Sequence, residues 1–248
     1  MKQELKYSRE EVQELNDQLS QLSAQEIVAC AVRKLGNRVI LASSFGAEDV
    51  VLIDMLCKAT ASPRIFLLDT GRLHQETYDI VDRIRARYGV EIEAYFPQTD
   101  AVQELIRVKG ANSFYESVEN RKECCFIRKV EPLARALSGV DAWVTGLRRS
   151  QSVTRGELPK IEIDGAHGGI LKINPLADWS EEEVWDYIRT NDVPYNKLHD
   201  QGFPSIGCAP CTRAVQPGED IRAGRWWWES PEHKECGLHI RDGEVIRK

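Results

Sequence analysis

The chain has 248 residues, and 33 Lys and Arg stand against 39 Asp and Glu, so its formal net charge is −6. This length fits one α/β domain with a core of its own. A negative balance argues against a dedicated nucleic-acid binder, so any anionic ligand must be met by local arginine clusters. Hydrophobic residues make up 42% of the chain, and no apolar run approaches the length of a membrane span, which argues against a membrane protein.

The N-terminal stretch is polar and acidic with helical periodicity, and it predicts helices over about residues 8–35. It lacks a basic start followed by an apolar block, so we expect no signal peptide and a cytoplasmic protein.

Strand and helix patterns alternate through the first 150 residues. Strands are predicted at 38–45, 64–71, 90–97 and 141–148, and helices at 47–59, 74–89 and 99–110. This alternation predicts an α/β fold, in which a mostly parallel twisted sheet is flanked by helices and binds its ligand at the carboxyl ends of the strands.

The second part of the chain is less regular. Residues 158–176 read as a hairpin and 180–192 as a helix capped by Ser180, and from about residue 199 glycine, proline and charge dominate. We expect one domain over residues 1–228 and a flexible segment over 229–248.

Seven cysteines in a reducing compartment are better suited to be ligands or nucleophiles than disulfides. Cys30 and Cys57 lie inside apolar helical patterns and read as small buried hydrophobes. Four others form an adjacent pair and a C-x-x-C pair, which could close a zinc site or hold an iron–sulfur cluster. Neighbouring helical side chains diverge by about 100°, which favours a 4Fe-4S cluster over one small ion. A redox-active C-x-x-C beside two buried cysteines is the alternative. The proposed ligands are Cys124, Cys125, Cys208 and Cys211.

Two short segments at strand ends could hold an anion or a nucleotide. Residues 43–49 place serines and a glycine before a helix, where backbone N–H groups and the helix dipole favour an anion, although a plain capped turn would look similar. Arginines on the loop after residue 147 suit phosphate or sulfate, although such loops are often only solvated surface. The candidates are Ser43, Ser44, Phe45, Gly46, Ala47, Glu48, Asp49, Leu68, Asp69, Thr70, Gly71, Arg148, Arg149 and Arg155.

The seventh cysteine, Cys236, lies near the C-terminus between charged residues and a glycine, which is unusual company for a residue type that is normally buried. A thiolate near an anionic substrate needs cations, and Lys129, Arg222 and Arg225 are candidates that would also lower its pKa. His239 could assist by hydrogen bonding, or it could be a surface histidine with no role.

With these residues in place, the chain closely resembles the sulfonucleotide (APS/PAPS) reductases, specifically the cluster-containing adenylyl-sulfate type. The resemblance runs from about residue 38 to 240 and rests on SSFGAED, LDTG, KECCFIRKVEPL, TGLRRSQSVTR, SIGCAPCTR and KECGLH, which stand in the family's order. It implies the adenine nucleotide α-hydrolase (PP-loop pyrophosphatase) fold. Residues 43–49 resemble a modified loop of that fold without the S-G-G-x-D-S form, which puts ATP cleavage in doubt.

The resemblance also implies a mechanism. Cys236 attacks the sulfur of adenylyl sulfate, AMP leaves, and reduced thioredoxin releases sulfite from the enzyme S-sulfocysteine. The cluster takes part in no net electron transfer, Lys129 links it to the substrate, and a separate thioredoxin is the reductant.

Two other activities stay open, namely reduction of 3′-phosphoadenylyl sulfate, alone or as a dual-substrate enzyme, and RNA sulfur transfer on the same fold. A non-catalytic cluster-binding regulator is a remote third. The acidic charge and the presence of ECGLH count against RNA thiolation. The sequence leaves oligomeric state open, including a homo-oligomer.

Overall fold

The computed structural model describes residues 6–151 and 156–230. Its centre is a six-stranded sheet in the order β3-β2-β1-β4-β6-β5. Neighbouring strands are parallel except for β5 and β6, which pair antiparallel. The strands are β1 (Val39–Ser43), β2 (Ile65–Leu68), β3 (Glu93–Tyr95), β4 (Ala142–Val144), β5 (Ile161–Asp164) and β6 (Ile170–Ile173). The predicted α/β class and the predicted hairpin are therefore confirmed.

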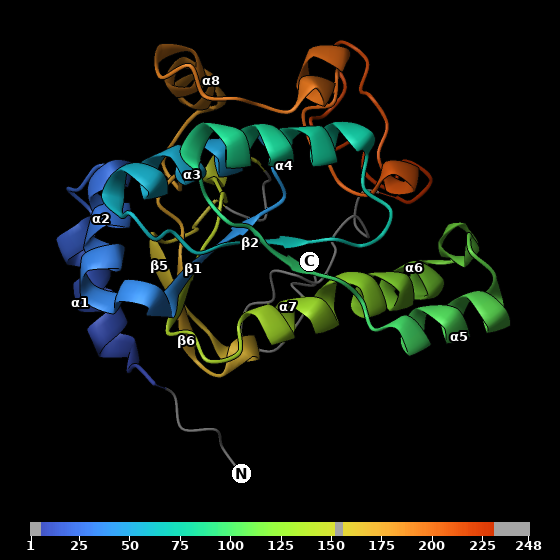
Figure 1. Ribbon diagram of the computed structural model, residues 1–248, viewed down its shortest axis with the longest axis horizontal. Coiled ribbons are helices and arrows are strands. Elements are labelled where there is room, and N and C mark those ends of the chain that lie inside the picture. The colour runs from blue at the N-terminus through green and yellow to red at the C-terminus, as the bar shows by residue number, and fades with distance from the viewer. Residues whose placement is uncertain (1–5, 152–155, 231–248) are drawn as a thin grey trace.

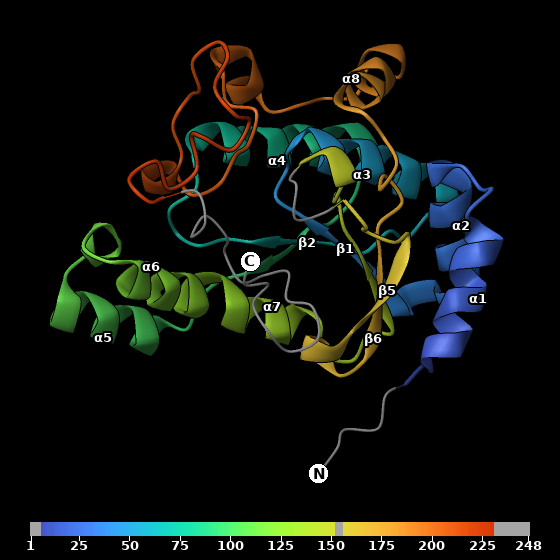
Figure 2. The ribbon, with the colours of Figure 1, turned by 180° about the vertical axis from the view of Figure 1, so that it is seen from behind.

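Helices cover both faces of the sheet (Figures 1 and 2). On one side lie α3 (Ala47–Ala59), α4 (Gln75–Tyr88) and α8 (Glu181–Thr190), with α1 (Arg9–Leu19) and α2 (Ala24–Leu35) beside them. On the other side lie α5 (Thr99–Lys109), α6 (Val118–Cys125) and α7 (Glu131–Ala136). Within the described residues, no helix is both long and apolar enough to cross a membrane.

The larger core lies between the sheet and the α3 side. Helix α3 is buried almost throughout and carries Asp54 into this core. The Asp54 carboxylate accepts hydrogen bonds from the hydroxyls of Tyr88 (3.0 Å) and Tyr187 (2.6 Å) and pairs with Lys58. This buried acid therefore joins α3 to α4 and α8, because a charge in the core is tolerated only when it is fully hydrogen-bonded.

The second core joins α7 to the opposite face of the sheet, through Leu133, Ile40, Phe66 and Trp143. Helix α6 runs into α7 through one wider, π-helical turn, η3 (Phe126–Val130), of a kind often found at functional sites. This turn carries Arg128 and Lys129 toward the carboxyl end of the sheet.

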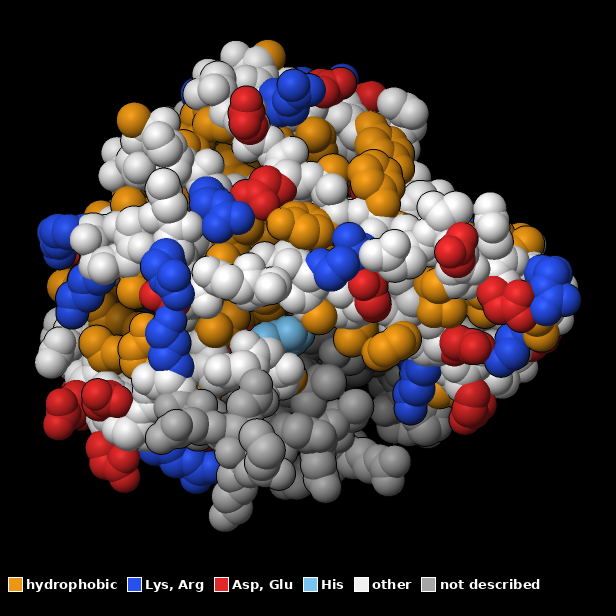
Figure 3. Space-filling view, turned by 60° about the horizontal axis from the view of Figure 1, so that its bottom comes forward, with side chains coloured by type: hydrophobic (Ala, Val, Ile, Leu, Met, Phe, Trp, Pro, Cys, Tyr) orange, Lys and Arg blue, Asp and Glu red, His pale blue; other side chains and the backbone are white. Residues whose placement is uncertain are grey.

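The last part of the described chain, residues 193–230, folds back over the carboxyl ends of β1 and β2 in loops and short helices, among them η7 (Lys197–Gln201) and η8 (Ala209–Cys211). Of the segment expected to be flexible, Glu229 and Ser230 are described and the Glu229 side chain is buried. The remainder, with Cys236 and His239, lies outside the described residues. On the face drawn in Figure 3, acidic, basic and apolar side chains are interspersed over the described surface.

Candidate functional site

A cavity of about 750 Å³ lies at the carboxyl ends of β1, β2 and β4. This is the edge at which the alternation of strands and helices predicted a ligand. Its far wall is formed by α8 and by loops between residues 199 and 225. Among the predicted substrate-binding residues, the following line this cavity: Ser43, Ser44, Gly46, Ala47, Glu48, Asp49, Leu68, Thr70, Lys129, Arg148, Arg222 and Arg225.

The loop between β1 and α3 is held by its own polar groups. The Asp49 carboxylate accepts from the Ser44 backbone N–H (2.6 Å) and from the Ser44 hydroxyl (2.8 Å), and the Phe45 N–H donates to the Ser43 hydroxyl (3.1 Å). Phe45 has a φ of 61° and is fully buried, so its side chain fills the core and does not line the cavity. The loop therefore has a fixed shape, with Gly46 capping α3 beside the cavity.

Burial raises the pKa of Asp49 to about 6, although its hydrogen bonds to Ser44 favour the charged form. Gly146, in the loop after β4, lies against this carboxylate, and a Cβ built there would stand 2.6 Å from Asp49 Oδ1. A glycine is therefore needed at position 146 for the two loops to meet.

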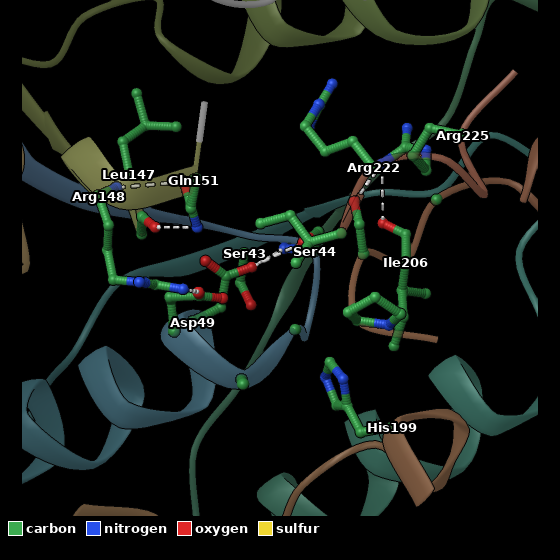
Figure 4. A pocket seen from close by; sticks show the side chains of 18 of the residues that line it. Ser43, Ser44, Asp49, Leu147, Arg148, Gln151, His199, Ile206, Arg222 and Arg225 are labelled. Carbon is green, nitrogen blue, oxygen red and sulfur yellow. Dashed lines mark hydrogen bonds and ion pairs between the residues drawn. The ribbon is translucent and has the colours of Figure 1, made fainter. Parts of the chain in front are cut away.

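The arginines of the loop after β4 have different positions. Arg148 is buried and its Nε donates to Glu48 Oε1 at 2.8 Å, so its charge is balanced inside the cavity wall (Figure 4). Arg149 donates to the Leu158 carbonyl at 2.8 Å and pairs with Asp178, and it does not line the cavity. Arg155 lies outside the described residues.

The end of β2 and the loop after it contribute two of the four residues predicted there. Leu68 and Thr70 line the cavity. The Asp69 carboxylate accepts from the Gly71 N–H (2.8 Å) and the Tyr78 hydroxyl (3.0 Å), so it shapes the loop. Thr70 Oγ1 lies 3.3 Å from Cys208 Sγ, which joins this loop to the cysteines.

The four cysteines predicted as ligands meet at a second, smaller cavity of about 20 Å³. One pair comes from the end of α6 and the other from η8 and the residue before it, so segments distant in sequence are brought together. Lys129 lines both cavities and therefore lies between them. The remaining residues around this smaller cavity are Arg72, Phe114, Arg121, Arg128 and Trp226.

The electrostatics of the cysteines are uneven. Burial opposes ionisation of Cys208, but Lys129, Thr70 and two arginines outweigh it and bring the Cys208 pKa below its ordinary value. Burial and the neighbouring Cys208 raise the pKa of Cys211 to about 12. Of these two thiols, Cys208 is therefore the one that ionises more readily.

The donor set fits an iron–sulfur cluster better than a single ion. Among residues 6–151 and 156–230, no three His, Cys, Asp or Glu side chains are grouped closely enough to hold one metal ion. Yet four soft thiol donors share one cavity, and the buried Arg128 Nε and Trp226 Nε1 beside it have no hydrogen-bond partner in the part of the chain that the structure describes. Donors left unpaired by the protein are suited to an anionic, sulfur-rich group.

Arg222 and Arg225 lie across the cavity from Arg148 (Figure 4). Arg225 Nη1 donates to the Ser205 hydroxyl at 3.2 Å, and its guanidinium lies over the Trp226 ring at 4.7 Å. Gly207 permits this placement, because a Cβ there would stand 2.6 Å from Arg225 Nη2. These cations give one side of the cavity a positive charge suited to phosphate or sulfate.

Sequence reasoning missed several residues of the site. His199 points into the larger cavity, its buried Nε2 has no hydrogen-bond partner among the described residues, and burial lowers its pKa. Arg72, Arg121 and Arg128 surround the cysteines. The position of Arg121, one helical turn before Cys125, was the available signal, since that spacing places two side chains on one face of a helix.

Comparisons with known proteins agree on one family. The phosphoadenosine phosphosulfate reductase domain matches residues 38–214. An adenosine 5′-phosphosulfate reductase from Burkholderia cepacia is 60% identical over 204 residues, which cover 82% of this chain and 81% of that protein. Its counterpart from Allochromatium vinosum is 55% identical over 220 residues, covering 89% and 85%.

A solved structure shows the same fold. The phosphoadenylyl-sulfate reductase from Candida auris, in a phosphate complex, superimposes with a TM-score of 0.72 at 36% identity and covers 85% of this chain and 99% of that one. Fold, matched domain and relatives together show that the chain belongs to the APS/PAPS reductase family.

Proposed function

We propose that this protein reduces adenylyl sulfate to sulfite and AMP in sulfate assimilation, with reduced thioredoxin as the electron donor. The observation that carries the proposal is that the Lys129 side chain lines both cavities. A nucleotide-sized space with a helix N-terminus at one end has cations at its other end, and one of these cations also lines the cavity of the thiols. The relatives named adenosine 5′-phosphosulfate reductase support the same activity.

Substrate binding follows from the charges of the walls. The base and ribose would occupy the end near residues 43–49 and Leu68, where the described part of the walls carries no unbalanced cation, because Glu48 pairs with Arg148. The phosphate and sulfate would face Lys129, Arg222 and Arg225, which balance the negative charge that repels an attacking thiolate.

The reaction needs two steps, in which Cys236 Sγ is first the attacking atom and then the atom that is attacked. The Cys236 thiolate attacks the sulfate sulfur, a sulfur–sulfur bond forms, the sulfur–oxygen bond to phosphate breaks, and AMP leaves with the electron pair. A thioredoxin thiolate then attacks Cys236 Sγ and expels sulfite. The second thioredoxin thiol closes its disulfide and returns Cys236 as a thiolate, so the two electrons come from thioredoxin.

A 4Fe-4S cluster would be held by Cys124, Cys125, Cys208 and Cys211. When bound, it supplies an ordered electrostatic environment beside the sulfate and gains no net electrons. The protein itself contributes cations around the thiols and the Thr70 contact to Cys208. Free thiols of this kind are kept in the reducing cytoplasm, where we place the protein.

The test is anaerobic incubation with adenylyl sulfate labelled on sulfur, without thioredoxin, followed by mass mapping. We expect label on Cys236 that reduced thioredoxin releases as sulfite. Cys236→Ser should take no label, whereas the matched control Cys30→Ser, in α2 and away from the site, should label like the wild type. Absence of label from an iron-loaded protein would contradict the proposal.

The same experiment separates the two family substrates. The related Candida auris protein is named for the 3′-phosphorylated nucleotide. Labelled 3′-phosphoadenylyl sulfate, run in parallel, should label Cys236 far more slowly than adenylyl sulfate. Equal rates would identify a dual-substrate enzyme.

A further inference from the structure

A buried ion pair joins α6 to the end of the described chain. Arg121 Nε lies 2.9 Å from Glu229 Oε1, and Nη2 lies 2.7 Å from Oε2. Their side chains are only 1% and 3% exposed. A buried pair of charges is tolerated only with good geometry, and a two-point arginine–carboxylate pair fixes orientation as well as distance. This contact is therefore a rigid joint in the fold.

The Arg121–Glu229 pair lies directly beside the segments that carry the cysteines. Residues 226–229, here called the tail root, form a turn in which the Glu229 N–H donates to the Trp226 carbonyl at 2.9 Å. The Trp226 N–H donates to the Cys211 carbonyl at 3.1 Å. The Arg121 guanidinium lies over the Trp226 ring at 4.7 Å, and Arg121 lines the same small cavity as Cys125. The segments that carry the two cysteine pairs therefore both contact the tail root.

We propose that Arg121 and Glu229 are positioning residues that hold the tail root beside the thiols and so keep Cys236 within reach of the substrate sulfur. This inference rests on the proposed function. Cys236 is seven positions beyond Glu229 in the sequence, so its Cα cannot be more than about 25 Å from that of Glu229.

The ion pair acts by raising the local concentration of the Cys236 thiol at the bound substrate. A thiol on a short tether meets a bound sulfate far more often than one on a loose chain, and the direction in which the tether leaves the body sets its approach. Without the carboxylate, the tail root loses its two hydrogen bonds to α6 and keeps only the Trp226 ring beneath the Arg121 guanidinium, whose buried charge loses its ion pair. Cys236 would then sample a larger volume while the nucleotide walls stay unchanged.

The test compares Glu229→Gln with Glu93→Gln, a control in a second arginine–carboxylate pair that is partly exposed. Glu93 also receives two arginine nitrogens, from Arg64, at 2.9 and 3.1 Å, but lies on β3 away from both cavities. Three quantities are measured on the full, iron-loaded chain: AMP affinity by calorimetry, iron content, and the single-turnover rate of labelling at Cys236. We expect Glu229→Gln to label about tenfold more slowly with AMP affinity and iron within about twofold of wild type. Glu93→Gln should change none of the three.

A second variant keeps the test decisive if Glu229→Gln does not fold. Glu229→Asp keeps the carboxylate but shortens its reach, and it should label at an intermediate rate. Wild-type labelling rates in both Glu229 variants would overturn the positioning role and leave the proposed function standing. A parallel fall of AMP affinity and labelling would also overturn it, because that pattern marks a general structural defect. No label in the wild type would instead remove the proposed function itself.

Discussion

At one end of the larger cavity, acids hold the structure together: Asp49 fixes the backbone of its own loop, and Glu48 balances the charge of Arg148. At the other end, Arg225 lines the larger cavity, and Lys129 lines both this cavity and the one that holds the thiols. The first end therefore presents backbone groups in a fixed shape to a ligand, whereas the second presents positive charge. We expect the first end to decide nucleotide affinity and the second to decide chemistry.

The strongest test of this division removes a thiol from the positive end. Cys208→Ser should lose the cluster and lower the single-turnover rate more than about 100-fold, while AMP affinity falls less than tenfold. Iron and sulfide analysis, labelling of Cys236 and calorimetry measure the three effects. Cys57→Ser, in α3, should keep its iron. Turnover at full rate without iron would show that the cysteine end serves structure only.

The acidic end can be probed through pH. Asp49 has a folded pKa of about 6 against an ordinary 3.8, raised by burial. Between about pH 4 and pH 6 the folded protein keeps this proton and the unfolded chain releases it. Wild-type stability therefore falls as pH rises through that window and is level above it.

Because Asn has no proton to lose, Asp49→Asn should gain about 3 kcal/mol relative to wild type from pH 4 to pH 7. Urea unfolding of both proteins at pH 4, 5, 6 and 7 measures this difference. Parallel stability curves would mean that Asp49 titrates normally and does not hold the loop through burial.

The smallest effects are expected from alanine substitutions of two glycines, one at each end of the larger cavity. A Cβ at Gly146 would meet Asp49 Oδ1 at 2.6 Å and Glu48 Cβ at 2.9 Å, both at the packed start of α3. A Cβ at Gly207 would meet the end of the long Arg225 side chain, which can turn aside. Calorimetry should show about tenfold weaker AMP binding for Gly146→Ala and about threefold for Gly207→Ala. The reverse order would place the affinity at the cation end.

Local patterns carried most of the fold prediction. The strand before Ser43, the helix after Gly46 and the capped helix after Ser180 were visible, because periodicity and caps act within a few residues. The meeting of the two cysteine pairs was inferred from the number and type of the ligands. The sequence did not show which cations face the cavity, because the residues that pair with these cations are remote in sequence.

Arg148 illustrates that limit. Its position after a strand predicted an anion contact, but Glu48, 100 positions away, accepts its hydrogen bond. Arg149 turns to Asp178 for the same reason. Arg121 was not singled out from the sequence, because its partner Glu229 lies 108 positions away. Charges identify candidate ligands for anions, but only the fold shows which charges are already balanced.

The contact between Thr70 and Cys208 spans 138 positions of the chain. Contacts across such a separation cost loop entropy before they contribute energy, so they belong to the late steps of folding. The β1–β2–β4 part of the sheet and its helices can assemble first, and the C-terminal segment then brings the second pair of thiols to the first. If the protein binds the proposed cluster, insertion of iron and sulfide would be a step for a nearly finished protein, and its success would report that the chain has folded as far as Cys211.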